Sequence, residues 1–158
     1  MLFTPSDFTP YPWLEYAYLA LGFNIRGNTA PNQHNPYIVE FFKYTQVHPN
    51  SQTDETAWCS AFVNWCMYNS GFSYTGHALA RTWLQWGTSL GSPIYGCVTV
   101  LSRDGGKGHV GFYVGPGQNS SDMTLLGGNQ DNSISIKSYP LNRLLGYRWP
   151  LGFPISID

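Results

Sequence analysis

Cys59 and His109 are the residues of this chain whose types and expected positions suit acyl transfer. Hydrolysis by a cysteine needs a thiolate, a base that generates it, a group that orients the base, and donors for an oxyanion. We expect Cys59 in the first turn of a helix, where unpaired backbone N–H groups and the positive dipole end stabilise a thiolate and an oxyanion. Cys59 is therefore the candidate nucleophile, and the competing interpretation is a small buried hydrophobe.

The other two cysteines are expected to be structural. Cys66 falls on the apolar face in the middle of the same helix, and Cys97 lies within a strand pattern. Cys59 and Cys66 are two helical turns apart, about 10 Å, which exceeds the disulfide reach of about 7 Å between Cα atoms. A bridge from Cys97 to either stays possible, but we expect three thiols and synthesis in a reducing compartment.

His109 is the candidate base. It follows a glycine-rich turn at the start of an expected strand and shares a face with Gly111 and Tyr113, so its ring can project toward a cleft. To orient this ring we expect Asn129, whose amide oxygen can accept the imidazole N–H, with Asp131 as the reserve. Turn formation is the competing role of the segment 129–132. The paired short spacings of zinc ligands are absent, and we expect no metal and no cofactor.

Four helices are expected in the first half of the chain: 12–21, a second that opens at Pro36, a third that carries Cys59 and ends before Gly71, and a fourth at about 78–87. Proline at its start and glycine after its end mark the first. The third has apolar residues at i, i+3, i+4, i+7 and i+8, and Asp54 or Thr56 can cap it. In the fourth, Leu79, Trp83 and Trp86 share one side.

The hydrophobic period then changes from that of helices to that of strands. Two expected strands, 95–101 and 109–114, are joined by a glycine-rich connection typical of a hairpin. Further strands are expected near 123–127, 133–139 and 145–149. Helices first and strands second predict an α+β fold, with N-terminal helices packed on a C-terminal antiparallel sheet. The length fits a single domain, 1–158.

Charged residues are sparse: Asp, Glu, Lys and Arg make up 11% of the chain, and the net charge is -1. Nothing therefore indicates binding to nucleic acid or to a membrane, and a substrate recognised through hydrogen bonds and aromatic stacking is favoured. No stretch approaches the ~18 apolar residues of a membrane span, and the first residues show no signal peptide. We expect a monomer made in the cytoplasm, which another machine must deliver if its substrate lies outside.

Several segments together resemble the small CHAP-like (cysteine, histidine-dependent amidohydrolase/peptidase) enzymes, which are grouped with NlpC-type peptidases and have a papain-like fold. These segments are Trp58 to Cys66, Thr75 to Leu84, Gly108 to Gly115, Gly127 to Gln130 and Leu145 to Pro150. The resemblance extends from the first helix to near Pro150. By position it implies Cys59 as nucleophile, His109 as base and Asn129 as third polar residue. Gly127 departs from the family, because some members carry a carboxylate there.

The resemblance also implies a reaction. Members of this family hydrolyse amide bonds of peptidoglycan and occur as phage lysis enzymes or as antibacterial effectors of type VI secretion. For this chain the resemblance implies a D-glutamyl–diaminopimelate endopeptidase, with an N-acetylmuramoyl-L-alanine amidase as the alternative. Such an enzyme acts in the periplasm or cell wall after delivery by a secretion system or a holin. Its expected partners, besides the stem peptide, are a cognate immunity protein or a component of the secretion machine.

Further residues are candidates for the oxyanion site or the cleft: Trp58, Ser60, Arg81, Tyr113 and Asp131. In the expected mechanism, helix-end amides including the N–H of Cys59 hold the oxyanion, and protonated His109 donates to the leaving amine. Two other functions compete with this one. The first is a non-catalytic wall-binding module of the same fold, and the second is a cysteine protease or acyltransferase that acts on protein substrates.

Overall fold

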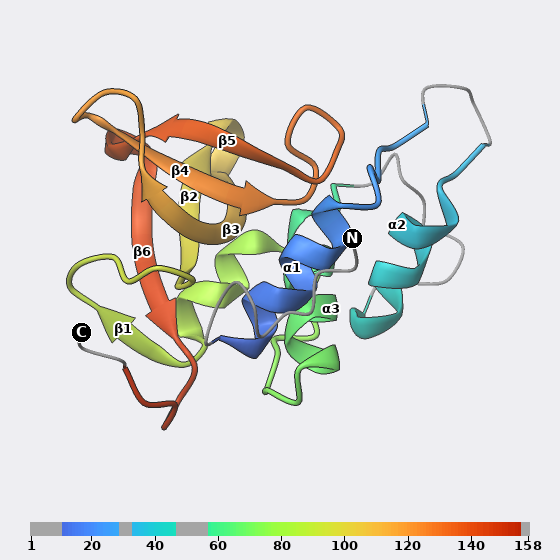
Figure 1. The fold of residues 1–158 in the computed structure, drawn as a ribbon, viewed down its shortest axis with the longest axis horizontal. Helices are drawn as coiled ribbons and strands as arrows, with labels where there is room; N and C mark the ends of the chain where they lie inside the picture. Colours follow the sequence, from blue (N-terminus) through green and yellow to red (C-terminus); the bar gives the residue numbers. More distant parts are fainter. Residues whose placement is uncertain (1–10, 29–32, 47–56, 156–158) are drawn as a thin grey trace.

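The computed structural model describes residues 11–28, 33–46 and 57–155. Its helical part comprises α1 (Pro12–Leu21), α2 (Pro36–Phe41), η2 (Phe42–Tyr44), α3 (Cys59–Asn69) and η4 (Ala80–Gln85). The strands and the short helices between them follow: β1 (Thr88–Leu90), β2 (Val98–Arg103), η5 (Asp104–Gly106), β3 (Lys107–Pro116), β4 (Asp122–Gly127), β5 (Ser135–Pro140), η6 (Leu141–Arg143) and β6 (Leu144–Trp149). The predicted α+β class is confirmed, with helices first and an antiparallel sheet second (Figure 1).

The helix ends follow from local chemistry. Pro12 begins α1, as the sequence predicts, since proline at the first helical position loses no hydrogen bond. The side chain of Asn35 caps α2 by accepting the N–H of Tyr37 at 2.9 Å. Gly71, after the end of α3, has a φ of 85°, the left-handed conformation that ends helices. The predicted caps of α3, Asp54 and Thr56, lie outside the described residues.

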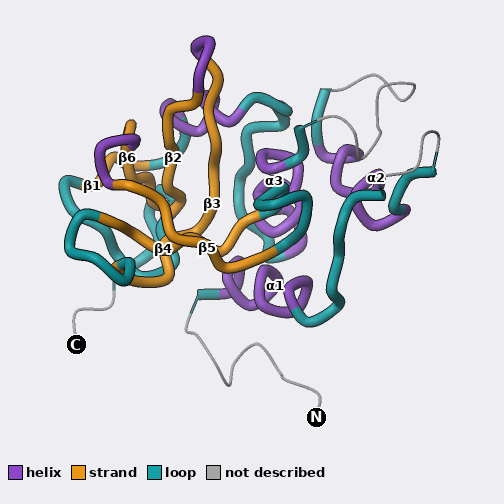
Figure 2. The backbone as a smooth tube through the Cα atoms, turned by 90° about the horizontal axis from the view of Figure 1, so that it is seen from above, coloured by secondary structure: helices purple, strands orange, loops and turns teal. Residues whose placement is uncertain are grey.

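The sheet has six strands in the order β1-β6-β2-β3-β4-β5, and all neighbours are antiparallel. The hairpin predicted between β2 and β3 is confirmed, with Leu101 opposite His109. Figures 1 and 2 both show α1 and α3 beside the sheet, with α2 on the far side of α3. The helix that begins with Cys59 is therefore the layer between the sheet and the outer helix.

Alternation along β3 directs its side chains to two different apolar clusters. Val110 and Phe112 belong to the large core that the sheet shares with α1 and α3. Leu101, Met123, Leu125 and Tyr139 form a second, smaller cluster, and the imidazole of His109 lies 5.2 Å from the Tyr139 ring, centroid to centroid. His109 and Val110 are adjacent, so they face opposite sides of the sheet.

The predicted fourth helix is wrong in type and extent. Residues Ala80–Gln85 form a 3₁₀ helix, and Leu79 before it has an extended backbone and a side chain that is 70% exposed. Trp83 and Trp86, which were predicted to share one side with Leu79, are both buried. Gly87, with a φ of 64°, turns the chain into β1, a short strand that was not predicted from the sequence and that pairs with β6.

Within the described residues, no helix is long and apolar enough to cross a membrane.

Candidate active site

Cys59 is the first residue of α3, the position predicted for a nucleophile. The β3–β4 ladder begins at Phe112 and Leu126, so the N–H of Val110 lies beyond it and reaches the Cys59 thiol. Burial raises the pKa of this thiol, whereas hydrogen bonds from the backbone of Val110, of Ser60 and of Cys59 itself lower it, as does the charge of Arg103. The thiol is therefore protonated at rest but surrounded by groups that stabilise its anion.

The remaining cysteines lack this setting. All three are free thiols, as predicted. Burial raises the pKa of Cys66 well above its ordinary value, and no opposing contribution acts on it. Burial also raises the pKa of Cys97 to about 11, and its sulfur lies 3.7 Å from the hydroxyl of Thr99 inside the sheet. Cys66 lies in the middle of α3 as expected, whereas Cys97 lies just before β2 rather than within it, and both are buried.

His109 is 5% exposed and is held by a side chain that the sequence analysis did not select. Its Nε2 lies 3.0 Å from Oε1 of Gln130 and 3.4 Å from the hydroxyl of Tyr139. Burial lowers the pKa of His109 to about 4; the bond to Gln130 opposes this change, and the charges of Arg143, Arg103 and Lys137 add to it. The imidazole is therefore neutral at pH 7 and able to accept a proton.

The amide of Gln130 determines which imidazole nitrogen carries the proton. Its Nε2 donates to the carbonyl oxygens of Leu125 at 3.2 Å and of Ser135 at 2.7 Å. Both carbonyls accept only, so the amide nitrogen must face them and its oxygen must face His109. The oxygen accepts the Nε2–H of the ring. The lone pair that can act as a base is consequently on Nδ1.

The orienting contact predicted for Asn129 is made by Gln130 instead. Asn129 has a φ of 56° in the turn between β4 and β5, and this turn is closed by two backbone hydrogen bonds between Gln130 and Ser133. The longer side chain of Gln130 returns along the sheet beside Gly127, where an added Cβ would lie 2.5 Å from Oε1. Glycine at this position makes room for the glutamine.

A segment distant in sequence clamps the same turn. Ile134 donates its N–H to the carbonyl of Ile25 at 2.9 Å, and Gly27 donates to the carbonyl of Asn132 at 2.8 Å. The side chain of Asn132 donates back to the carbonyl of Gly27 at 3.0 Å. The loop that follows α1 thus holds the turn from which Gln130 reaches His109.

Two residues predicted to line the oxyanion site or the cleft are fully buried. Trp58 packs against Phe41, and an added Cβ on Gly128 would lie 2.6 Å from its ring. The hydroxyl of Ser60 donates to the carbonyl of His77 at 2.7 Å and accepts from the indole of Trp83 at 2.9 Å. Ser60 therefore contributes its backbone to the thiol of Cys59, and its side chain holds the segment after α3.

The side chains of the other three predicted cleft residues bond to or pack against groups other than His109. Arg81 donates from Nε and from a terminal nitrogen to the carbonyl of Lys107, at 3.1 and 2.9 Å, and so connects η4 to β3. Tyr113 is half-buried and meets Tyr147 edge to face, farther along the sheet. Asp131, the reserve orienter, forms an ion pair with Lys137 at 2.8 Å.

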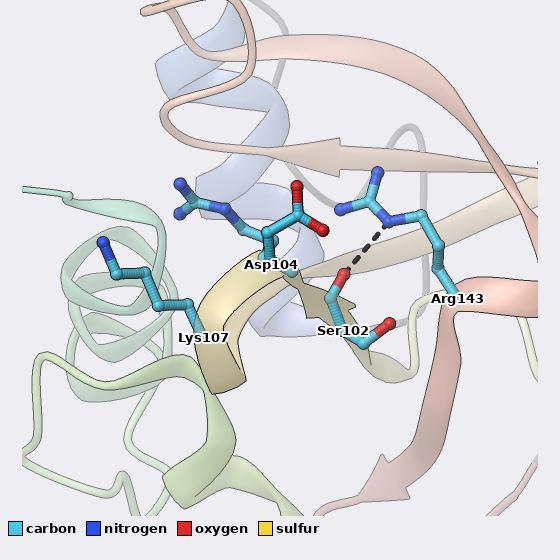
Figure 3. A pocket seen from close by; sticks show the side chains of 5 residues that line it. Ser102, Asp104, Lys107 and Arg143 are labelled. Atoms are coloured by element: carbon cyan, nitrogen blue, oxygen red, sulfur yellow. Dashed lines mark hydrogen bonds between the residues drawn. The ribbon is translucent and has the colours of Figure 1, made fainter.

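The imidazole of His109 lines a cavity of about 300 Å³. Its other lining residues are the turn 129–131, Tyr139, and three cations, Arg103, Lys137 and Arg143. A neighbouring cavity of about 610 Å³ shares Arg103 and Arg143 and adds Ser102, Asp104 and Lys107 (Figure 3). These cations were not predicted as site residues, although Arg103 ends the strand that leads to the glycine-rich turn and to His109.

No group of three or more His, Cys, Asp or Glu side chains among the described residues is arranged to hold a metal ion. No protein-family model matches the chain, and no curated protein sequence is significantly similar to it.

Proposed function

We propose that this protein is a cysteine amidohydrolase with a papain-like fold that cleaves an amide bond of peptidoglycan. One observation carries the proposal: the thiol at the start of α3 accepts a hydrogen bond from Val110, the neighbour of His109, whose imidazole is in turn bound by Gln130. Nucleophile, base and orienter thus come from a helix, a strand and a turn that pack together. Cysteine hydrolases require a nucleophile next to its base and a third group that orients the base, and this packing supports the proposal.

The chemistry proceeds from a neutral pair. Nδ1 of His109 takes the proton of Cys59 as the sulfur attacks the carbonyl carbon, and the backbone N–H of Cys59 stabilises the oxyanion together with the dipole of α3. Protonated His109 then donates to the leaving amine. Water, deprotonated by the same imidazole, attacks the thioester and releases the acid and the thiol.

The stem peptide is the proposed substrate because of the five segments that resemble CHAP-like enzymes, four of which lie at or beside the site. A D-glutamyl–diaminopimelate endopeptidase is favoured over an N-acetylmuramoyl-L-alanine amidase. The protein would serve as an antibacterial effector or a lysis enzyme, made in the cytoplasm and delivered to the wall by a secretion system or a holin. An immunity protein or a secretion component would be its partner.

The test is digestion of purified peptidoglycan by wild type, Cys59→Ala and the matched variant Cys66→Ala, with fragments identified by mass spectrometry. We expect new free amines from wild type and Cys66→Ala, and a loss of about 10⁴-fold or more in Cys59→Ala. The mass of the new termini names the bond. An intact polymer after digestion, with cleavage or acylation of protein substrates, would support the protease or acyltransferase instead.

A second candidate, a non-catalytic wall-binding module of the same fold, is favoured by one observation. Cys59 is only 3% exposed, and burial raises its pKa, as in an inert structural thiol. This module would sediment with insoluble peptidoglycan and release no fragments from it, and Cys59→Ala would bind as well as wild type.

A further inference from the structure

Positive charge is concentrated at the two cavities beside His109. Four of the chain's eight Lys and Arg residues line them: Arg103, Lys107, Lys137 and Arg143. Only two acidic residues, Asp104 and Asp131, share the lining, and Asp131 is already paired with Lys137 at 2.8 Å. The cavities are therefore cationic in a chain whose net charge is -1. Such a concentration of one sign of charge in a concave site attracts ligands of the opposite sign.

Arg143 is held in a defined orientation within this lining. Its Nε donates to the carbonyl of Ser102 at 3.0 Å, as Figure 3 shows, and its guanidinium carbon lies 5.2 Å from the centre of the Tyr139 ring. The same ring contacts the imidazole of His109. The bond to Ser102 uses one of the five N–H donors of a guanidinium, and the terminal nitrogens keep the fork that binds a carboxylate through two bonds.

The cations also oppose the charge that catalysis creates. The proposed mechanism makes His109 an imidazolium, and Arg143, Arg103 and Lys137 all act against that cation. A carboxylate bound among them would offset their repulsion just when the imidazole takes the proton of Cys59. A neutral ligand in the same place would bring no such compensation.

We propose that the cavity lined by His109, Arg103 and Arg143 is a subsite for a carboxylate that the substrate carries beside its scissile amide. This inference rests on the proposed function and names the substrate class more closely: an acidic peptide, rather than its amidated counterpart. A cavity of about 300 Å³ is at the lower end of the size range of small-ligand sites. It suits one acidic residue better than a length of polymer.

The first experiment compares two synthetic stem peptides that differ only in whether the glutamyl α-carboxyl is free or amidated. We expect wild type to prefer the free carboxylate by about tenfold in kcat/KM, the value of one charged hydrogen bond. Arg143→Gln and Arg103→Gln should reduce this preference to about twofold or less, mainly by raising KM for the carboxylate. Arg143→Lys should restore part of it, and Lys43→Gln, which removes a cation on η2, should leave it intact.

Equal kinetics on the two peptides in wild type would overturn the inference, as would an Arg143→Gln variant that slows both peptides by the same factor. Thermal unfolding of each variant shows whether it folds, and Arg103→Gln keeps the test decisive if Arg143→Gln does not, because Arg103 is exposed.

The second experiment does not depend on hydrolysis. Alkylation of Cys59 by iodoacetate is compared with alkylation by neutral iodoacetamide, by mass spectrometry of the peptide that contains Cys59. We expect the ratio of the iodoacetate rate to the iodoacetamide rate to be about fivefold higher at Cys59 than for glutathione. This ratio should fall toward that of glutathione in Arg143→Gln, and also in about 0.5 M salt, which screens the cations of the cavity. A ratio equal to that of glutathione contradicts the subsite. A high ratio without cleavage of either peptide contradicts the proposed function and leaves the anion site standing.

Discussion

The first turn of α3 and the turn that holds Cys66 each bury a cysteine, yet their surroundings differ. Around Cys59 are backbone N–H groups of Val110, Ser60 and Cys59, with the charge of Arg103 nearby, while Cys66 experiences burial alone. Burial raises the pKa of both thiols, so burial does not distinguish them. The end of the helix and the neighbouring strand do, because they supply donors that a mid-helix position has already used in its own hydrogen bonds.

The largest expected difference between the two turns is in reactivity toward iodoacetamide. Cys66 is fully buried and reacts only when the protein opens, at a free-energy cost of about 5 kcal/mol or more, so Cys59 should react at least about 10³-fold faster. Because its thiol is protonated at rest, the rate at Cys59 should rise with pH from about pH 5 to 8, and Cys66 should stay unmodified. Peptide mapping after timed labelling measures both rates.

His109→Ala provides the control for this labelling. The distinction between the two turns would be removed if the labelling rate of Cys59 were flat from about pH 5 to 8 and matched the rate of Cys66 in the His109→Ala control.

The next effect concerns the group that orients the base. Gln130→Ala should lower kcat by about 10²-fold with little change in KM, because the imidazole loses the acceptor that keeps its proton on Nε2. Asn129→Gly, one residue away and compatible with a φ of 56°, should change kcat by less than about twofold. Steady-state kinetics on a stem peptide measures both.

A Gln130→Glu variant sharpens this test. A carboxylate beside the imidazole raises the pKa of His109 from about 4, so the acid limb of the kcat/KM profile should move to higher pH. An unchanged limb, or an equal loss in Asn129→Gly, would mean that Gln130 does not orient the base.

The last expected effect is on stability rather than on rate. His109 has a pKa of about 4 in the folded protein and about 6.5 when unfolded. Between these values the unfolded state binds a proton that the folded state excludes, so stability falls as the pH drops from about 6.5 to 4, by up to about 3 kcal/mol. Urea unfolding at pH 7, 5 and 4 measures this, and the dependence should be weaker in His109→Gln.

The matched control for this stability measurement is His77→Gln, which should retain the pH dependence of wild type. The thiol of Cys66 is protonated in both the folded and the unfolded state at these pH values, so Cys66 contributes no comparable loss of stability at low pH. Identical pH dependence in His109→Gln and wild type would show that His109 is not buried in its neutral form.

Local signals predicted most of the fold. Proline and glycine mark the ends of α1, and the apolar period of α3 is regular, so both helices lie where expected. The fourth helix failed because an apolar pattern at helical spacing does not distinguish an α-helix from a 3₁₀ turn followed by extended chain. β1 was missed since its three residues carry no hydrophobic period, and only its pairing with β6 makes it a strand.

The candidate site was predictable where a single element positions a side chain. Cys59 and His109 occupy the expected helix start and strand. Gln130 was missed because its contact depends on how a turn of several left-handed residues bends and on the space left at Gly127. Arg103 and Arg143 come from separate elements that meet only in the folded sheet, so their sequence positions give no indication that they share a cavity.

The backbone pairing between the loop after α1 and the turn before β5 has a consequence for synthesis. Ile25 and Gly27 leave the ribosome long before Asn132 and Ile134, their partners. A nascent chain that already contains Cys59 and His109 still lacks the residues that align the imidazole. At roughly 5–20 residues per second, the wait between Cys59 and Ser133 lasts about 4–15 s. During that interval the thiol is present without an oriented imidazole, so a ribosome-bound or prematurely terminated chain lacks the arrangement that the proposed activity requires.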